Sequence, residues 1–297
     1  MAYQLSNGMI TVDIAEPGDY RETRFEWNGM ITGIALNEGG HTFCIAENLN
    51  PEQQQGGIGL CHEFGIKEAI GYQEAEPGEP FPKLGVGVLT RIDEKPYLFH
   101  RDYPVQPYKV EVEQEDACRI TFRTLPEACR GYAALLEKTI SIEGQRLSIE
   151  YTLHNTGEKL LSTEEYCHNF LNIDGYDVGP DYRLDFPVEL QPEADEEETL
   201  QDLLFSSGTV QWKKVPDREF YFRSPGFDGR QKPYLWELRH VPSGTGVRET
   251  SKLEVSYAAL WGRSYVVAPE LFVKVEAAPG ESVHWTRTYE FFSEKKQ

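Results

Sequence analysis

The feature of this chain that most constrains its fold is an alternation of apolar and polar residues that recurs along most of its length. In the segment 146–154 every second residue is apolar, namely Leu147, Ile149, Tyr151 and Leu153. A period of two is typical of a strand with one buried face. Similar patterns predict further strands over 9–14, 30–36, 108–113, 119–123, 253–261 and 283–292.

Turn-forming pairs separate these segments from one end of the chain to the other. They include Asn7-Gly8, Asn28-Gly29, Gly39-Gly40 and Pro279-Gly280. A sustained 3.6-residue apolar repeat is missing from the sequence, and only the segment 196–205 looks helical. Many short strands with frequent turns predict an all-β sandwich or barrel. Because the same strand character continues on both sides of the acidic run 195–198, we expect a single domain over residues 1–297.

Charge and cysteine content narrow the classes of function. The formal net charge of −20 makes nucleic-acid binding unfavourable. The N-terminus lacks the basic and apolar regions of a signal peptide, and no stretch approaches the length of a membrane span. Five cysteines without a CxxC pair predict reduced thiols and a cytoplasmic location. Cys61 and Cys167 lie beside histidines, but we expect them to be small buried residues.

The sequence carries no motif for a nucleotide, and it has neither a GxSxG elbow nor an HExxH helix. We therefore expect no cofactor and no metal. The expected partner is a small molecule, with no nucleic acid and no membrane, and the expected assembly is a monomer or a homodimer.

The strongest candidate for a functional residue is His168, in the stretch 166–172 at the end of a strand-like run. A lone histidine in an apolar strand is usually structural. This one is followed by Asn169 and Asn172, whose amides can bind hydroxyl groups, and by Phe170, whose ring can stack on a sugar. His100, His154, His240 and His284 lack such neighbours and are expected to have surface or structural roles.

A second candidate region is the glycine-rich segment 55–91. Glycines this frequent around strands permit bulges and close backbone approach, which are common beside ligand clefts. His62, Glu63 and Lys83 are the polar residues in this apolar context, and Glu63 with Lys83 can equally form a structural ion pair. Tyr72, Trp236 and Trp261 are further candidates for rings that stack on a sugar. Asp228 and Arg239 are weaker candidates for contacts with its hydroxyl groups.

These motifs resemble those of the aldose 1-epimerase (galactose mutarotase-like) superfamily. The stretch 168–172 is similar to the family's His-x-Tyr-Phe-Asn element, and the segments 56–61 and 64–65 are similar to elements of its hexose-6-phosphate branch. Trp261, Pro269-Glu270 and the segment 279–281 resemble the region that carries the family's catalytic glutamate. The resemblance implies a mostly antiparallel β-supersandwich and the interconversion of α and β sugar anomers by acid–base catalysis.

The resemblance also implies roles for two residues, with Glu270 as the base and His168 as the acid that protonates the ring oxygen. A catalyst should then hold the two side chains within about 6–7 Å of each other across a sugar-sized cleft. Glu270 could instead form an ion pair with Arg263 or Lys274, and Glu276 is then the fallback base.

The sequence departs from the family pattern at two places. Gln55 stands where the phosphosugar branch has an arginine, and the family's first active-site histidine lacks a clear counterpart, Lys83 and His62 being the candidates. The alternative function is therefore a non-catalytic carbohydrate-binding protein with the same fold.

Overall fold

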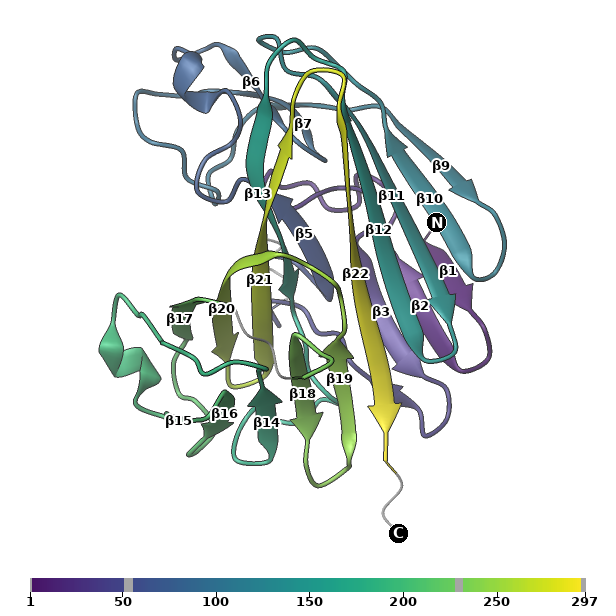
Figure 1. The fold of residues 1–297 in the computed structure, drawn as a ribbon, viewed down its shortest axis with the longest axis vertical. Coiled ribbons are helices and arrows are strands. Elements are labelled where there is room, and N and C mark those ends of the chain that lie inside the picture. The colour runs from purple at the N-terminus through teal and green to yellow at the C-terminus, as the bar shows by residue number, and fades with distance from the viewer. Residues whose placement is uncertain (1, 51–55, 228–231, 295–297) are drawn as a thin grey trace.

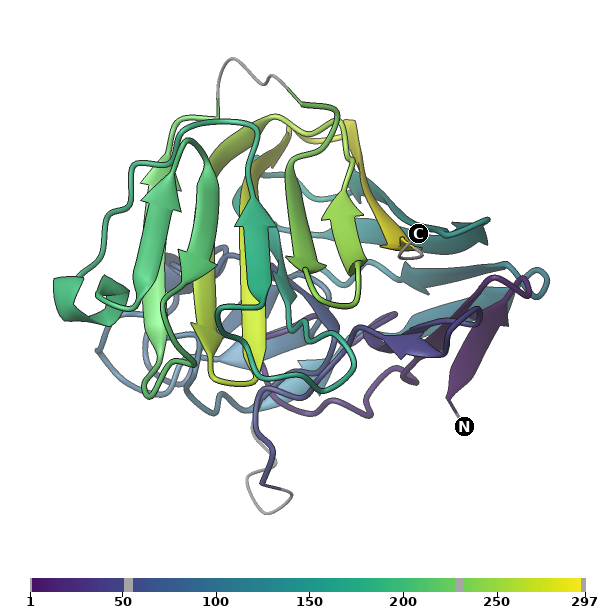
Figure 2. The same cartoon turned by 90° about the horizontal axis from the view of Figure 1, so that it is seen from below.

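The computed structural model describes residues 2–50, 56–227 and 232–294 of the chain. Two large antiparallel sheets face one another, and a small third sheet lies beside them at the top of the molecule (Figure 1). Viewed from below, the two large sheets form the layers of a sandwich (Figure 2). The expectation of an all-β, mostly antiparallel fold is confirmed.

The first sheet has nine strands, in the order β1-β2-β3-β5-β13-β21-β20-β17 with β4 paired to β3. Their bounds are β1 (Tyr3–Ser6), β2 (Ile10–Ile14), β3 (Ile31–Leu36), β4 (His41–Thr42), β5 (Leu60–Phe64), β13 (Leu161–Asn169), β17 (Phe220–Pro225), β20 (Val255–Arg263) and β21 (Val266–Ala277).

The second sheet has ten strands, in the order β15-β16-β14-β18-β19-β22-β12-β11-β10-β9. Their bounds are β9 (Val110–Gln114), β10 (Arg119–Thr124), β11 (Ala134–Glu143), β12 (Arg146–Asn155), β14 (Tyr182–Asp185), β15 (Leu203–Ser206), β16 (Thr209–Trp212), β18 (Trp236–His240), β19 (Thr245–Glu249) and β22 (Ser282–Ser293).

The third sheet is formed by β6 (Pro80–Lys83), β7 (Gly87–Thr90) and β8 (Val105–Pro107). It encloses a separate aromatic cluster that includes Tyr72, Phe81, Tyr97 and Tyr103. The two short helices of the described residues are 3-10 turns, η1 (Tyr72–Glu74) and η2 (Glu197–Leu200). The expectation of a helix over 196–205 is therefore wrong beyond Leu200, because that segment turns and continues as β15.

The alternation seen in the sequence is reproduced in the burial of the strands. Along β12 the residues Leu147, Ile149, Tyr151 and Leu153 are buried against the first sheet, and the predicted strand boundaries agree with those observed to within two residues. The main apolar core lies between the two large sheets and draws side chains from both.

Gly59, directly before β5, occupies a position that requires glycine. Gly59 has φ 66°, and a Cβ at this position would lie 2.2 Å from the carbonyl oxygen of Ile31. A larger residue would push β5 away from β3, since a left-handed conformation and a backbone contact both exclude a side chain.

Candidate active site

His168 and Glu270 are neighbours across adjacent strands of the nine-stranded sheet. The pairing of β13 with β21 matches Glu165 with Val273, and the isolated bridge of Leu171 with Val267 keeps the same register. His168 lies three residues after Glu165 and three before Leu171. The shared register therefore places it opposite Glu270. Directly opposite residues of an antiparallel pair bring their side chains together on one face.

The two side chains are in direct contact. Nε2 of His168 lies 3.1 Å from Oε1 of Glu270, and the two residues are 3% and 4% exposed. This is closer than the separation expected from the sequence. The alternative ion pairs of Glu270 are not formed, since Arg263 pairs with Glu219 and Lys274 with Glu276.

Aromatic rings enclose the imidazole of His168. The ring of Phe170 stacks on it at 4.0 Å with an interplanar angle of 11°, and the rings of Trp261 and Phe25 meet it edge-on at 5.2 and 5.9 Å. These contacts hold the imidazole in one orientation and exclude water from its faces. Phe170 is thus placed behind His168 and is fully buried.

Burial shifts the pKa values of the pair in opposite directions. Desolvation raises the pKa of Glu270 to about 8, with the Arg24 cation opposing this and Glu63 and Glu47 adding to it. Desolvation, helped by Arg24, lowers the pKa of His168 well below its ordinary value. The charged forms of both groups are disfavoured in the low-dielectric site. At neutral pH these shifts leave one proton on the pair, and it resides on Glu270.

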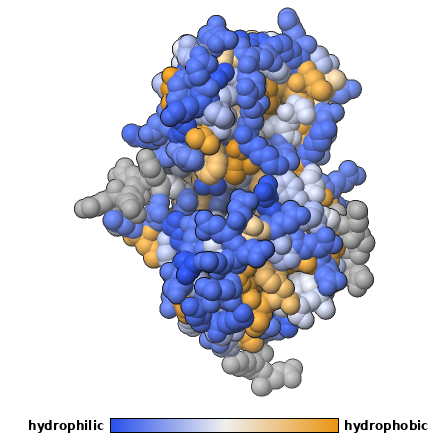
Figure 3. All heavy atoms as spheres, turned by 90° about the vertical axis from the view of Figure 1, so that its left-hand side faces the viewer, coloured by the Kyte–Doolittle hydropathy of each residue, from blue (hydrophilic) through white to orange (hydrophobic). Residues whose placement is uncertain are grey.

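The pair opens onto a cavity of about 610 Å³, within the range of small-molecule sites. In Figure 3 the surface on this side of the molecule is hollowed at mid-height, with apolar residues showing between hydrophilic ones. Its lining combines aromatic rings with charged groups: Tyr20, Glu22, Arg24, Phe25, Glu47, Asn48, Gly56, Ile66, Phe99, His100, His168, Glu219, Tyr221, Trp261, Arg263 and Glu270.

Arg24 is the lining residue that sequence reasoning missed and that is held most firmly. Its Nε donates to Oε2 of Glu63 at 3.2 Å and its Nη2 to the hydroxyl of Tyr166 at 3.1 Å. The guanidinium also packs over the rings of Phe25 and Phe99, at 4.5 and 4.4 Å. Among the described residues, Nη1 has Glu47 as its charged partner, at 3.9 Å, so this edge of the guanidinium can donate to a ligand.

Glu63 and Lys83 form the structural ion pair that was one of the two expectations for them. Nζ of Lys83 donates to Oε1 of Glu63 at 3.2 Å and to the hydroxyl of Tyr97 at 3.0 Å, and neither Glu63 nor Lys83 lines the cavity. Glu63 acts on the site indirectly, because its other oxygen holds Arg24 and Tyr166.

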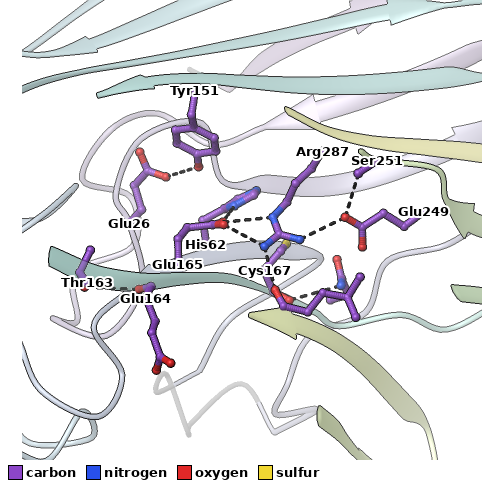
Figure 4. Close-up of polar contacts among 12 residues, drawn as sticks. Glu26, His62, Tyr151, Thr163, Glu164, Glu165, Cys167, Glu249, Ser251 and Arg287 are labelled. Carbon is purple, nitrogen blue, oxygen red and sulfur yellow. Dashed lines mark hydrogen bonds and ion pairs between the residues drawn. The ribbon is translucent and has the colours of Figure 1, made fainter. Parts of the chain in front are cut away.

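His62 does not line the cavity; it is buried in the core between the two large sheets. Figure 4 shows it beside Glu165 and Arg287. Its Nδ1 lies 2.8 Å from Oε1 of Glu165, which in turn pairs with Arg287. Successive residues of a strand face opposite sides of the sheet. On β5, Glu63 faces the cavity side and His62 the core, just as His168 and Glu165 do on β13.

The two asparagines of the histidine stretch bind backbone groups. Asn169 donates to the carbonyl oxygen of Pro269 at 2.6 Å and accepts from the hydroxyl of Tyr289. Asn172 donates to the carbonyl oxygens of Tyr176 and Tyr265. Both are buried and do not line the cavity. Asn169 thus ties β13 to the backbone of β21 at Pro269, directly before Glu270.

Of the weaker candidates, Trp261 lines the cavity. Trp236 and Arg239 belong to β18 in the other large sheet, where Trp236 donates to Glu249 and Arg239 pairs with Glu237 and Glu294. Asp228 and Gln55 lie outside the described residues. Four further residues lie away from the cavity. Tyr72 is buried in the third-sheet cluster, and Glu276 pairs with Lys274. Cys61 and Cys167 are buried free thiols whose pKa values burial raises.

His100 was expected to have a surface or structural role. It is exposed, and it lines the cavity beside Phe99. Tyr20, Glu47 and Tyr221 also line it without having been singled out. The only signal in the sequence was the mixture of aromatic and charged residues in segments such as 20–27, which is too common to identify a site.

Within the described ranges, no group of three His, Cys, Asp or Glu side chains is arranged to hold a metal ion. No helix among the residues that the structure describes is long and apolar enough to cross a membrane.

Comparison with solved structures identifies the class of fold: it is the galactose mutarotase-like β-sandwich. Among its matches, the Slr1438 protein from Synechocystis sp. PCC 6803 has a TM-score of 0.66 and 15% identity, over 99% of this chain and 96% of that one. A galactose mutarotase related enzyme from Lactobacillus acidophilus has a TM-score of 0.60 and 14% identity, over 99% and 98%.

The aldose epimerase homologue from C. elegans has a TM-score of 0.62 and 12% identity, over 99% of both chains. No protein-family model matches the sequence, and no curated protein matches it. At these identities the likeness establishes the fold, and the function has to be argued from the site.

Proposed function

We propose that this protein is an aldose 1-epimerase that interconverts the α and β anomers of a sugar. The observation that carries the proposal is the His168–Glu270 pair, two titratable groups in contact at 3.1 Å on the wall of a cavity of about 610 Å³. Two groups whose pKa values are pushed in opposite directions by burial are typical of acid–base sites.

The proposed reaction needs one proton to leave the sugar and one to enter it. Glu270 removes the proton of the C1 hydroxyl, and His168 protonates the ring oxygen as the bond between C1 and that oxygen breaks. After rotation about the C1–C2 bond of the open-chain aldehyde, the reverse transfers close the ring with the C1 hydroxyl on the other face. The proton count and the redox state of the sugar are unchanged, so the reaction needs no electron carrier.

The reactive form follows from the single proton of the pair. Before the reaction the proton is on Glu270. Its transfer to Nε2 of His168 across 3.1 Å gives a carboxylate base and an imidazolium acid. The Arg24 cation stabilises the carboxylate of this form, because it lowers the pKa of Glu270, and it makes the imidazolium a stronger acid, because it also lowers the pKa of His168. Its Nη1 edge is available to bind a sugar oxygen and so to orient the ring.

We expect kcat/KM to fall as the pH rises through about 8, because the pair then loses its only proton and no acid remains. On the acidic side kcat/KM should stay level to well below pH 6.5, since the pKa of His168 is lowered. The pH–rate profile of the wild-type protein, corrected for spontaneous anomer exchange, measures both limits. A rate that keeps rising above pH 9 would contradict the one-proton mechanism.

The proposal is tested by polarimetry on freshly dissolved α anomers of glucose, galactose and other aldoses, with and without the protein. Acceleration of at least one aldose beyond the spontaneous rate is the expected result. If none is accelerated while calorimetry still detects binding, the alternative of a non-catalytic carbohydrate-binding protein replaces the proposal. The ion pair that fixes Lys83 is what favours that alternative, because it leaves the cavity without a catalytic group from β6.

A further inference from the structure

The charged groups around the cavity carry information about the substrate that the acid–base pair does not. Besides Glu270, three carboxylates line the cavity, those of Glu22, Glu47 and Glu219. The cations that line it are Arg24 and Arg263. Because the pair of His168 and Glu270 holds one proton and no net charge, the acids exceed the cations in the lining.

Both cations are already engaged by carboxylates of the protein. Arg24 is held by Glu63 and Arg263 by Glu219, whose Oε2 accepts from Nε at 3.1 Å and from Nη2 at 2.9 Å. A phosphate or carboxylate on a sugar would have to compete with these carboxylates for the same guanidinium groups. Recognition of such anions normally relies on the open, bidentate face of an arginine.

Glu22 has the opposite character. Its carboxylate has no ion pair or hydrogen bond to any other residue in the ranges 2–50, 56–227 and 232–294, although it lines the cavity. Asp102 and Glu47 are near enough to repel it, and with its partial burial they raise its pKa. A cationic group bound at Glu22 would give this carboxylate an ion-pair partner and offset its repulsion by Asp102 and Glu47.

We infer that the site selects its sugar by charge, accepting an amino sugar in preference to a neutral aldose and rejecting phosphorylated and acidic sugars. The inference deepens the proposed function and rests on it for the identity of the ligand as an aldose. Its basis is geometric: a carboxylate in the cavity wall without a partner among the described residues, and two guanidinium groups that are each already bound to a carboxylate of the protein. The ammonium group of a 2-amino-2-deoxy aldose carries the charge that would pair with the Glu22 carboxylate.

The experiment compares 2-amino-2-deoxyglucose, glucose, glucuronate and glucose 6-phosphate at pH 6.5 and low salt, by magnetisation-exchange NMR of the two anomers. Each rate is corrected for the spontaneous rate of the same sugar. We expect kcat/KM for the amino sugar to exceed that for glucose by about three- to fivefold. We expect kcat/KM for glucose 6-phosphate to be about tenfold or more lower than that for glucose. Because salt screens exposed charges, 0.5 M NaCl should bring kcat/KM for the amino sugar and for glucose 6-phosphate closer to the value for glucose.

Glu22→Gln tests the residue, and Glu150→Gln, which removes an exposed charge on β12 of the other sheet, is its matched control. Glu22→Gln should bring the ratio of amino sugar to glucose close to one, whereas the control should leave the wild-type ratio unchanged. Equal kcat/KM for the amino sugar and glucose in the wild-type protein would overturn the inference. A higher kcat/KM for glucose 6-phosphate than for glucose would overturn it as well.

The same four sugars are also compared by calorimetric titration. If no sugar is turned over, the proposed function has failed, and the order of the four affinities still decides the charge preference. Tightest binding of the amino sugar would support the inference, and equal or reversed affinities would overturn it.

Discussion

Replacing Glu270 with Gln, or His168 with Asn, is expected to slow the catalysed exchange of anomers by about 10²–10⁴-fold. Both substitutions keep a side chain of similar size and remove the group that accepts or delivers the proton. Because the two residues work on one shared proton, the double variant should be little slower than either single variant. Polarimetry with the sugar that the wild-type protein accelerates most measures these rates.

Two controls separate loss of chemistry from loss of structure. His154→Asn changes a histidine on β12 that is bonded to Ser282 and lies outside the cavity, and it should retain the wild-type rate. Calorimetry should show that Glu270→Gln still binds the sugar. A single variant that keeps more than about a tenth of the wild-type rate would remove its residue from the mechanism, because one positioned group is worth at least 10²-fold.

The positions of seven strands, β2, β3, β9, β10, β12, β20 and β22, were predicted from the sequence, but the order in which the strands pair was not. Alternation along β12 identifies the strand and its buried face, because it depends only on the chain's own residues. The pairing of β12 with β22 joins segments more than 100 residues apart and is decided by packing of the whole molecule. Only the resemblance to a known family connected His168 with Glu270 before the structure was available.

The remaining site residues show where such reasoning ends. His62 and Glu63 are adjacent and polar, and the sequence does not tell which of them faces the cavity; the structure assigns that side to Glu63. Trp236 and Arg239 lie in the other sheet. Arg24 comes from the connection between β2 and β3, which has no periodicity to mark it. Its role depends on Glu63 and Tyr166, which the fold brings to it from distant segments.

Replacing Arg287 with Met is expected to lower the free energy of unfolding by about 3–5 kcal/mol, because it leaves buried carboxylates without their cation. Arg287 is fully buried, and its guanidinium pairs with Glu165 at 2.8 Å and with Glu249 at 3.1 Å (Figure 4). Burial raises the pKa of Glu165, but Arg287 and His62 outweigh it and leave that pKa at about 2. Denaturant unfolding at pH 7 measures the loss.

The matched control is Arg248→Met, on β19, where the arginine is partly exposed and pairs with Glu237 and Glu290. Removal of such an exposed pair should cost about 1 kcal/mol or less. A loss of under 1 kcal/mol for Arg287→Met would contradict the expectation.

The lowered pKa of Glu165 also fixes how the stability of the wild-type fold depends on pH. Glu165 stabilises the fold above pH 4.5, and this contribution disappears as the pH falls through about 2.

Arg287 also connects this buried ion-pair network to the candidate active site. Nη2 of Arg287 also donates to the carbonyl oxygen of Leu271 at 2.8 Å, so the arginine holds β21 one residue after Glu270, while its ion pair with Glu165 holds β13 three residues before His168. Loss of Arg287 should therefore loosen the register that keeps the pair in contact. We expect the folded fraction of Arg287→Met to show a lower kcat than Arg248→Met, because a misplacement of about 1 Å can cost up to 10²-fold in rate.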